Sequence, residues 1–412
     1  VAAILAWPVL GITVRGLQWW LGGEEAFGER ERRLLGVLFL LAFGLRFVGA
    51  LSPRFFAHDA LFHVHRLEAI EQGQLFFEHV SLEWGMRNDP YPGVYYLLLV
   101  PLHLLYRNAE ALLAFVTSWL DGASVLAVWY LARSLAGKRA AIWAAWLYAF
   151  MPIGLAANWA GVYTNLFGYD FLLLVTAALV AAWRRQGNLS AVRWVPVWVV
   201  HFLSHFGTVV LGVPWLLTWV GLLYAPANRG QRRWLRRLLL LWAFALGLAV
   251  LLYYSFFLGV MLHGARSVFA EKAGELAAPD ATLPTRWAAL QVWWRWGAVV
   301  DFGGLGLFLG ILGWLVMPRR RAGEAAGAWL VASVAVALPF WVISRVLFLS
   351  VRTMLFILPA VSIGCGLLLS RIARRGSVGR VVAVVVASYI CLLGISIWLG
   401  VCFAGMRPPH VY

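Results

Sequence analysis

Charged residues are scarce in this chain of 412 residues. Asp, Glu, Lys and Arg make up 13% of it, against roughly a quarter in soluble domains. Hydrophobic residues account for 62%, and the mean hydropathy is +0.80. So few charges cannot cover the surface of a water-soluble domain of this size. The composition therefore excludes a soluble protein and predicts a polytopic, all-α membrane protein.

Signatures of several enzyme classes are also missing from the sequence. It has no phosphate-binding glycine loop, no nucleophile elbow and no zinc signature. The three cysteines, Cys365, Cys391 and Cys402, lie inside apolar runs without the spacing of a metal site or a disulfide, so we expect them to be small core residues. No internal repeat and no soluble domain of any size stands out.

Apolar runs long enough to cross a bilayer occupy most of the chain. With a length of about 20 residues as the criterion, we predict eleven spans, near 34–51, 110–133, 140–158, 166–183, 192–206, 208–225, 237–260, 298–317, 325–343, 351–370 and 381–403. The run 1–21 is interrupted by Pro8 and Arg15, so it is either a twelfth span or a helix lying in the interface. The chain opens on Val1, which leaves open that it is a fragment.

Charge patterning predicts the orientation of these spans. The net charge of +16 comes in short clusters between apolar runs, which favours membrane topology over nucleic-acid binding. By the positive-inside rule, the clusters around Arg32, Lys138, Arg184, Arg233, Arg320 and Arg374 are all cytoplasmic. The remaining connections hold most of the acids and face outward. The chain then divides into an N-terminal apolar segment with a cytoplasmic loop (1–33) and a transmembrane domain (34–412), with long outer connections at 52–109 and 261–297.

The first outer connection contains a polar stretch, His58 to Ile70. At 100° per residue, Asp59, His63 and Arg66 share one helical stripe. We expect an amphipathic helix on the membrane surface with this stripe facing water. The run Val94 to Tyr106 is short for a span, and counting it as one would reverse every later charge cluster. We therefore predict a second interfacial helix there.

This layout resembles the GT-C class of integral membrane glycosyltransferases, which includes protein mannosyltransferases and the aminoarabinose transferase. The residues His58-Asp59-Ala60-Leu61-Phe62-His63-Val64-His65-Arg66, with Pro90-Tyr91-Pro92-Gly93-Val94-Tyr95-Tyr96, are most similar to membrane proteins named as related to 6-pyruvoyl-tetrahydropterin synthase. The resemblance implies a GT-C-like bundle of about eleven or twelve transmembrane helices. It also implies a donor sugar on a polyprenyl phosphate, and a glycan or protein acceptor at the outer face of a prokaryotic plasma membrane.

The resemblance further implies site residues. Asp59 is placed to act as the base that takes the acceptor proton; alternatively it caps or solvates the interfacial helix. His63 and Arg66 could contact the leaving phosphate, or form an ordinary solvated polar edge. His58, Asp59, His63 and His65 carry metal-ligand chemistry, yet one helix would not present all four together, so a divalent metal stays an alternative and no metal ligand is assigned.

Later residues complete the expected substrate site. His205 is a candidate for the lipid phosphate, or one of two histidines bonded between helices. Arg345 and Arg352 could clamp the same phosphate, or snorkel to the interface. Many GT-C members carry a second acid at the outer end of the third span; here Asn158 lies there, and Asp170 could replace it. Asp121 lies in mid-membrane, where a paired structural role competes with a functional one.

Two other functions fit the same pattern. A flippase or transporter for a lipid-linked glycan would also have many spans with intramembrane acids, although we see no inverted repeat. A GT-C-like subunit without catalytic activity, held in a larger membrane complex, is the second alternative.

Overall fold

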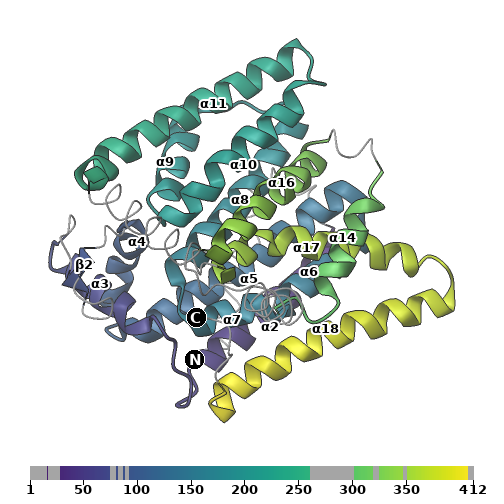
Figure 1. Ribbon diagram of the computed structural model, residues 1–412, viewed down its shortest axis with the longest axis horizontal. Coiled ribbons are helices and arrows are strands. Elements are labelled where there is room, and N and C mark those ends of the chain that lie inside the picture. Colours follow the sequence, from purple (N-terminus) through teal and green to yellow (C-terminus); the bar gives the residue numbers. More distant parts are fainter. Residues whose placement is uncertain are drawn as a thin grey trace, which may run out of the picture.

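The computed structural model describes residues 16, 28–74, 80–81, 87–88, 92–259, 301–318, 324–346 and 350–406; side chains at 80–81, 87–88, 341–346 and 350–353 are outside the description. The described chain is a helical bundle (Figure 1). Its helices are α2 (Glu29–Ala50), α3 (Ala60–Glu71), α4 (Val94–Leu105), α5 (Ala109–Ala136), α6 (Lys138–Phe150), α7 (Pro152–Ala160), α8 (Tyr163–Arg184), α9 (Ala191–Phe202), α10 (Phe206–Tyr224), α11 (Arg229–Ala249), η3 (Val250–Tyr254), α14 (Gly306–Leu315), α16 (Ala325–Val346), α17 (Ser350–Ile372) and α18 (Ser377–Ala404).

A single small strand pair interrupts this helical pattern within the described residues. Strands β1 (Val80–Ser81) and β2 (Arg87–Asn88) pair antiparallel, with Val80 opposite Asn88. They lie in the first outer connection, between α3 and α4. The prediction of an all-α membrane bundle is confirmed.

Every predicted span falls on a helix, and the lengths differ. Among the described residues, eight helices are long and apolar enough to cross a membrane: 29–50, 109–136, 138–160, 163–184, 206–224, 229–259, 354–372 and 377–404. The predicted spans near 192–206 and 298–317 fall on α9 and α14, which have 12 and 10 residues. At 1.5 Å rise per residue such helices cover about 15–18 Å, roughly half of the hydrocarbon core. The segments 1–15 and 260–300 are outside the described residues.

One predicted span, 140–158, is broken into α6 and α7. Pro152 occupies the first turn of α7 and cannot donate a backbone hydrogen bond, and the preceding Met151 is extended (φ −65°, ψ 135°). The break leaves carbonyls near the end of α6 available to other partners. One of these, from Ala149, accepts a hydrogen bond from a buried arginine that is central to the site.

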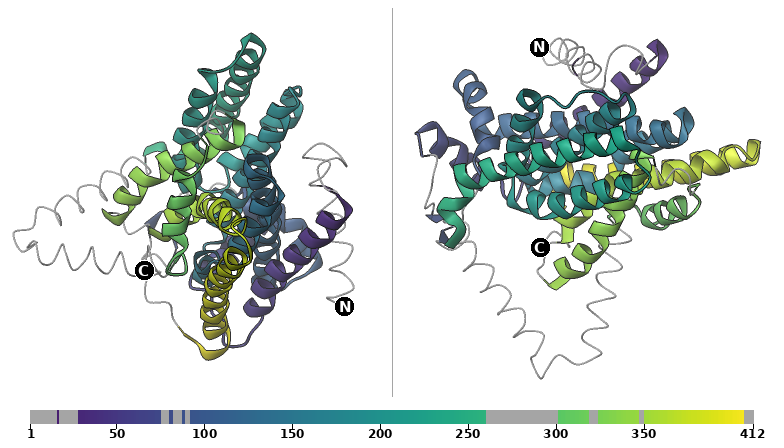
Figure 2. Two further views of the ribbon diagram at one scale, coloured as in Figure 1. Left: turned by 90° about the vertical axis from the view of Figure 1, so that its right-hand side faces the viewer. Right: turned by 90° about the horizontal axis from the view of Figure 1, so that it is seen from above.

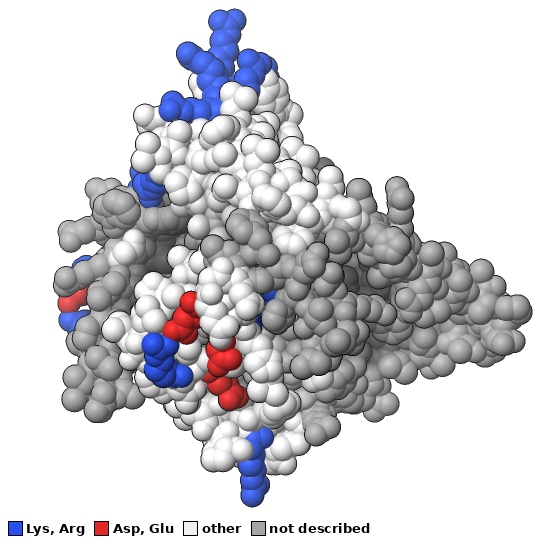
Figure 3. All heavy atoms as spheres, turned by 90° about the vertical axis from the view of Figure 1, so that its left-hand side faces the viewer, with Lys and Arg blue, Asp and Glu red and all other residues white. Residues whose placement is uncertain are grey.

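Contacts between connections agree with the alternation predicted from charge. Glu31, at the start of α2, lies 2.8 Å from Lys138 and 3.4 Å from Arg133, at the turn between α5 and α6. Arg184 donates to Ser134 (3.0 Å), so the end of α8 lies at the same end of the bundle. All of these belong to connections assigned to the cytoplasm. In Figure 3, basic side chains gather at the upper end of the face, where one end of α11 lies in Figure 1, apart from the acids lower down.

Small residues let the helices pack closely. On α14, a Cβ at Gly313 would stand 1.8 Å from the carbonyl oxygen of Gly364 on α17, so the two backbones touch. Such small-residue contacts are the usual means of helix association in membranes.

The cysteines follow the expectation from sequence: Cys365 and Cys402 are buried and Cys391 is half-buried. The outer helices α2 and α18 lie side by side, joined by the Trp398 indole, which donates to the Leu45 carbonyl (2.8 Å) (Figure 2).

The two helices α3 and α4 form a pair at one edge of the bundle (Figure 1). Glu71, the last residue of α3, accepts hydrogen bonds from His103 (2.7 Å) and Arg107 at the end of α4. These hydrogen bonds, with Arg107 first, lower the pKa of Glu71 from its usual 4.5. The side chains of Leu98, Leu102 and Leu105 on α4 are exposed, as expected of a helix that lies in the membrane interface.

Candidate functional site

Asp59 lies where the chain enters α3. It occupies the N-cap position, yet its side chain makes no capping hydrogen bond to the helix, and 19% of that side chain is exposed. Its Oδ1 lies 3.9 Å from Nε2 of the exposed His58. The side chain therefore does not cap the helix, whereas the alternative that it solvates the helix stays open. The carboxylate has a water-accessible face at the boundary of the bundle.

The backbone around Asp59 is fixed by the end of α7. The amides of His58 and Asp59 donate to the carbonyls of Trp159 and Ala160, each at 3.2 Å. The last carbonyls of a helix have no partner within it. The loop that carries Asp59 therefore supplies these missing donors for α7, and α7 in turn sets the position of Asp59.

Gly161 closes this junction. It is left-handed (φ +72°, ψ 19°), a conformation that favours glycine, and it ends α7. A Cβ at this position would stand 2.9 Å from the amide nitrogen of Asp59 and 3.3 Å from its Cα. Any side chain here would displace the backbone of Asp59. Gly161 thus permits both the turn and the close approach.

His63 and Arg66 do not face water as expected. Both side chains are buried (each 1% exposed), whereas Leu61, which was expected on the membrane side, is 51% exposed. The His63 Nδ1 and the Tyr96 hydroxyl are 2.6 Å apart, and Tyr163 packs against the His63 ring with 5.2 Å between centroids. The polar stripe turns inward because tyrosines of α4 and α8 offer partners there.

Arg66 follows on the same inward stripe. Its guanidinium lies over the Phe62 ring, 5.5 Å from the centroid, which is within the range of a cation–π contact. It lies about two helical turns, or roughly 10 Å, further along α3 than Asp59. The structure thus places Asp59 at the start of α3 and His63 and Arg66 further along it. The Asp59 side chain is partly exposed, and the other two side chains are buried against the bundle.

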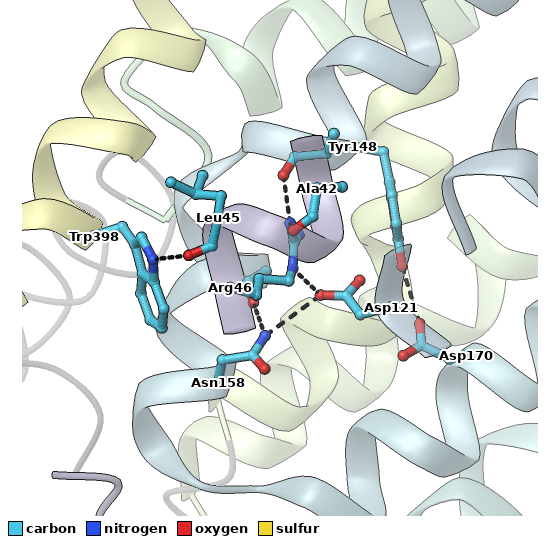
Figure 4. Close-up of polar contacts among 10 residues, drawn as sticks. Ala42, Leu45, Arg46, Asp121, Tyr148, Asn158, Asp170 and Trp398 are labelled. Carbon is cyan, nitrogen blue, oxygen red and sulfur yellow. Dashed lines mark hydrogen bonds and ion pairs between the residues drawn. The ribbon is translucent and has the colours of Figure 1, made fainter. Parts of the chain in front are cut away.

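A second polar group lies inside the bundle, alongside α7 (Figure 4). Arg46 of α2 is fully buried and forms an ion pair with Asp121 of α5, which is also buried. Arg46 Nη1 donates to the carbonyls of Ala42 (3.1 Å) and Ala149 (2.8 Å). The Asn158 amide donates to Asp121 Oδ2 at 3.4 Å. Asp121 therefore has the paired role that competed with a functional one in the sequence.

Asp170 belongs to this inner group and not to the Asp59 group. The Tyr148 hydroxyl donates to its Oδ1 at 3.1 Å, and Asp170 is 3% exposed (Figure 4). A cavity bounded by α5, α6, α7, α8, α10, α16 and α17 is lined by Asp121, Tyr148 and Asp170, together with mostly apolar residues. Asp59, His63 and Arg66 are not among the residues that line it. Asp170 is thus an inner acid, and its assignment to the substrate site stays a prediction.

His205 has a local structural role. It is the N-cap of α10, and its Nδ1 accepts from the Gly207 amide at 3.0 Å. The turn that holds it packs on α8, because a Cβ at Gly207 would stand 3.9 Å from Asn165. Arg345 and Arg352 lie in α16 and α17, but their side chains are outside the described residues. Their proposed phosphate clamp stays a prediction.

The metal alternative finds no ligand set in the described part of the chain. No group of three or more His, Cys, Asp or Glu side chains converges there to hold a metal ion. On α3 the reason is visible: His63 points inward to Tyr96, whereas His65 is exposed. His63 and His65 therefore point in different directions, and only His58 and Asp59 lie near each other among the four candidate donors.

Sequence reasoning missed several residues of these two groups. Arg46 was counted within an apolar span, although an arginine inside such a span is a functional signal by itself. Gly161 and Tyr148 had no signal that distinguished them from the many other glycines and tyrosines. Tyr96 belonged to the quoted tyrosine pair, but nothing in the sequence joined it to His63.

Comparison with known proteins gives a fold and no family. No family model matches the sequence, and no curated protein matches it. Solved structures of an oligosaccharyltransferase from Archaeoglobus fulgidus are similar in fold. Its complex with Zn and sulfate aligns with a TM-score of 0.62 at 14% identity, covering 88% of this chain and 52% of that one. Its complex with an inhibitory peptide and a dolichol-phosphate aligns with a TM-score of 0.61 at 15% identity, covering 89% and 55%.

The apo form of the same enzyme aligns with a TM-score of 0.58 at 14% identity, covering 89% of this chain and 55% of that one. The chain thus spans about half of the length of these structures. At such identities the likeness shows the fold, which is a GT-C-like membrane bundle.

Proposed function

We propose that this chain is a membrane glycosyltransferase that moves a sugar from a polyprenyl-phosphate donor to an acceptor at the membrane surface. The observation that carries the proposal is the setting of Asp59: a carboxylate with a water-accessible face, on a backbone fixed by α7, at the edge of a GT-C-like bundle. We assign this edge to the outer face of a prokaryotic plasma membrane, because it belongs to a connection rich in acids.

In the proposed reaction Asp59 is the general base. Its carboxylate takes the proton of an acceptor hydroxyl, the acceptor oxygen forms a bond to the anomeric carbon, and the bond from that carbon to the phosphate oxygen breaks. The phosphate leaves with the electron pair, so the polyprenyl phosphate is released as an anion. A positioned base of this kind typically contributes about 10²–10⁴-fold to the rate.

We propose that His63 and Arg66 support the role of Asp59 by positioning α3. Their burial favours a positioning function: the His63–Tyr96 hydrogen bond and the Arg66–Phe62 contact hold α3 against the bundle. Cations for the leaving phosphate would come from Arg345 and Arg352, which the sequence nominates. His205, whose Nδ1 accepts from the Gly207 amide, would donate to the phosphate from Nε2 as a neutral imidazole. Arginine suits that task because its planar fork matches phosphate oxygens.

The solved structures guide the choice of substrates for a test. One was determined with a dolichol-phosphate, and another with a tethered acceptor peptide that contains the sequon NVT. We propose a donor of the same chemical class for this chain, a sugar on a long isoprenoid phosphate. The resemblance of His58 to Arg66 to the 6-pyruvoyl-tetrahydropterin synthase-related membrane proteins stays a prediction.

The decisive experiment measures transfer by purified protein in lipid nanodiscs. Radiolabelled polyprenyl-phosphate sugars are supplied with a mixed membrane extract or an Asn-Val-Thr peptide as acceptor, and Asp59→Asn is compared with wild type. Glu68→Gln is the matched control, because Glu68 is an exposed acid on the same helix. We expect transfer by wild type and by the control, and a loss of about 10²-fold or more in Asp59→Asn.

Three results would contradict the proposal. Equal transfer by wild type and Asp59→Asn would remove Asp59 as the base. Movement of the labelled lipid across proteoliposome membranes without any transfer would favour the flippase, and stoichiometric co-purification of an inactive chain with other membrane proteins would favour the subunit of a complex.

A further inference from the structure

The inner group contains more negative than positive charge. Asp121 and Asp170 line one cavity, and among the described side chains that line it there is no arginine, lysine or histidine. The nearby cation is Arg46, which is paired with Asp121. Two ionised carboxylates beside one guanidinium would leave a net charge of −1 inside the bundle. An unbalanced buried charge is so costly that such a group normally becomes neutral.

Polar atoms without partners surround the same place. Asp170 Oδ2, Ser124 Oγ and Arg46 Nη2 are buried and make no hydrogen bond of good geometry among the described residues, although Ser124 lies close enough to interact with the Asp170 carboxyl group. Ser124 follows Asp121 by three residues on α5. Arg46 Nη2 faces Gly154, another residue that lines the cavity. A Cβ added at Gly154 would stand 3.4 Å from Arg46 Nη2. Asp170 therefore lines the cavity, and the acceptor and donor atoms of Ser124 and Arg46 lie next to residues that line it.

The cavity has room for water. The volume open to the centres of water-sized spheres is about 30 Å³, and one buried water needs roughly 10–15 Å³ by this measure. One or two water molecules could therefore join Asp170 to its neighbours. The remaining walls, such as Leu172, Trp215 and Phe356, are apolar.

We propose that this cavity is a proton-binding site within the membrane, in which Asp170 carries the proton beside an ionised Arg46–Asp121 pair. The proton comes from bulk water and binds Oδ2 of Asp170. Oδ1 keeps the hydrogen bond from Tyr148. The added O–H group gives the cavity a donor, and the inner group becomes neutral. The proposal does not depend on the reaction assigned to Asp59.

The charged and titratable groups that face Asp170 favour a proton over a metal cation. Among the described side chains they are Tyr148 from α6, Asp121 from α5 and, behind Asp121, Arg46 from α2. Tyr169 also lines the cavity. A cation such as Na⁺ would need several oxygen ligands and would lie near the Arg46 guanidinium, which repels it. A proton needs one oxygen and adds no bulk.

Infrared spectroscopy of the protein in nanodiscs tests the proposal. A neutral carboxylic acid has a C=O stretch that is well separated from that of a carboxylate. At neutral pH we expect this band in wild type, its loss in Asp170→Asn, and no change in the exposed-acid control Glu68→Gln. Absence of the band in wild type, or its persistence in Asp170→Asn, would overturn the proposal.

Thermal unfolding gives a second, independent readout. An asparagine resembles the neutral acid, so Asp170→Asn should melt within about 2 °C of wild type. Asp121→Asn removes the partner of a buried guanidinium and should lower the melting temperature by about 5 °C or more. Equal losses in both variants would show that Asp170 is ionised and would contradict the proposal. If Asp121→Asn fails to fold, the infrared comparison of Asp170→Asn with wild type decides alone.

Salt dependence separates a proton from a sodium ion. The band should have the same intensity in sodium chloride and in choline chloride. If sodium removes the band and raises the melting temperature of wild type but not of Asp170→Asn, the site binds a metal cation and the proposal is wrong.

Discussion

One short helix, α7, contacts both Asp59 and the inner group with Asp121 and Asp170, and these acids differ in almost every physical respect. Asp59 lies beyond the C-terminal end of α7, partly exposed, with its backbone fixed and its side chain not used as a cap. Asp121 and Asp170 are buried, and their side chains are bonded to Arg46 and Tyr148. A carboxylate that must exchange protons with a substrate needs access, whereas a buried one needs partners. We therefore propose a chemical role for Asp59 and a supporting role for Asp121 and Asp170.

Helix α7 connects the two groups mechanically. Asn158 donates to Asp121 within the bundle, and the next two carbonyls along the chain accept the amides of His58 and Asp59. A change in the inner group is therefore expected to reach Asp59 through about one turn of helix. Variants in which stability and transfer are measured separately test whether the two groups have these different roles.

The largest effect on stability is expected from Arg46→Met. It leaves Asp121 buried without its ion-pair partner, which costs about 3–5 kcal/mol of unfolding free energy. Combining it with Asp121→Asn removes both charges and should recover much of the loss. Chemical denaturation in detergent micelles measures both. A double variant as unstable as the sum of the single variants would show that the two charges are not coupled.

Gly161→Ala tests whether the position of the Asp59 backbone matters for transfer. The added methyl group meets the Asp59 backbone and strains a left-handed residue, so transfer is expected to fall by about 10–100-fold. Gly187→Ala is the control, because its Cβ would meet nothing closer than 3.6 Å. Labelled-sugar transfer is the measurement, and equal rates for the two variants would contradict the positioning role of Gly161.

A smaller effect is expected from Tyr96→Phe. It leaves the buried His63 Nδ1 without the Tyr96 hydroxyl, which should cost about 1–3 kcal/mol. Tyr389→Phe serves as the control, because the Tyr389 side chain is half exposed. Both are compared by thermal unfolding. If Tyr96→Phe were as stable as the control, the bond would not hold α3 in place.

The smallest effect is the loss of stability of the α3–α4 pair at low pH. Because the pKa of Glu71 is lowered in the folded state, its contribution to stability is present above the unfolded value of 4.5 and is lost as the pH falls through the folded value. Hydrogen exchange in α3 and α4 should rise over that range in wild type. In Glu71→Gln this rise should be absent, and an identical rise in both proteins would exclude Glu71 as its source.

The sequence predicted the helices well and the orientation of their side chains less well. Apolar length and charge alternation are properties of the chain itself, so every predicted span falls on a helix and connections assigned to one side meet. The stripe of Asp59, His63 and Arg66 was also correct as a periodicity. Which way it faced depended on Tyr96 and Tyr163, from α4 and α8, and no local pattern joins those residues to α3.

The inner group illustrates a second limit. Asp121 was recognised as a buried acid that needed a partner, but Arg46, 75 positions earlier in the sequence, was not identified as that partner. The sequence predicted one continuous span over 140–158. The structure breaks this span before Pro152, which frees the Ala149 carbonyl for Arg46. Long-range pairing of polar residues is set by helix packing, which a single sequence does not specify.

The central claim is that the exposed acid performs chemistry and the buried acid does not. The most direct measurement compares Asp59→Asn and Asp170→Asn in one transfer assay with a polyprenyl-phosphate sugar, at equal amounts of folded protein. We expect Asp59→Asn to lose transfer by about 10²-fold or more, and Asp170→Asn to stay within a few-fold of wild type. Unchanged transfer in Asp59→Asn, or an equal loss in both variants, would contradict the account.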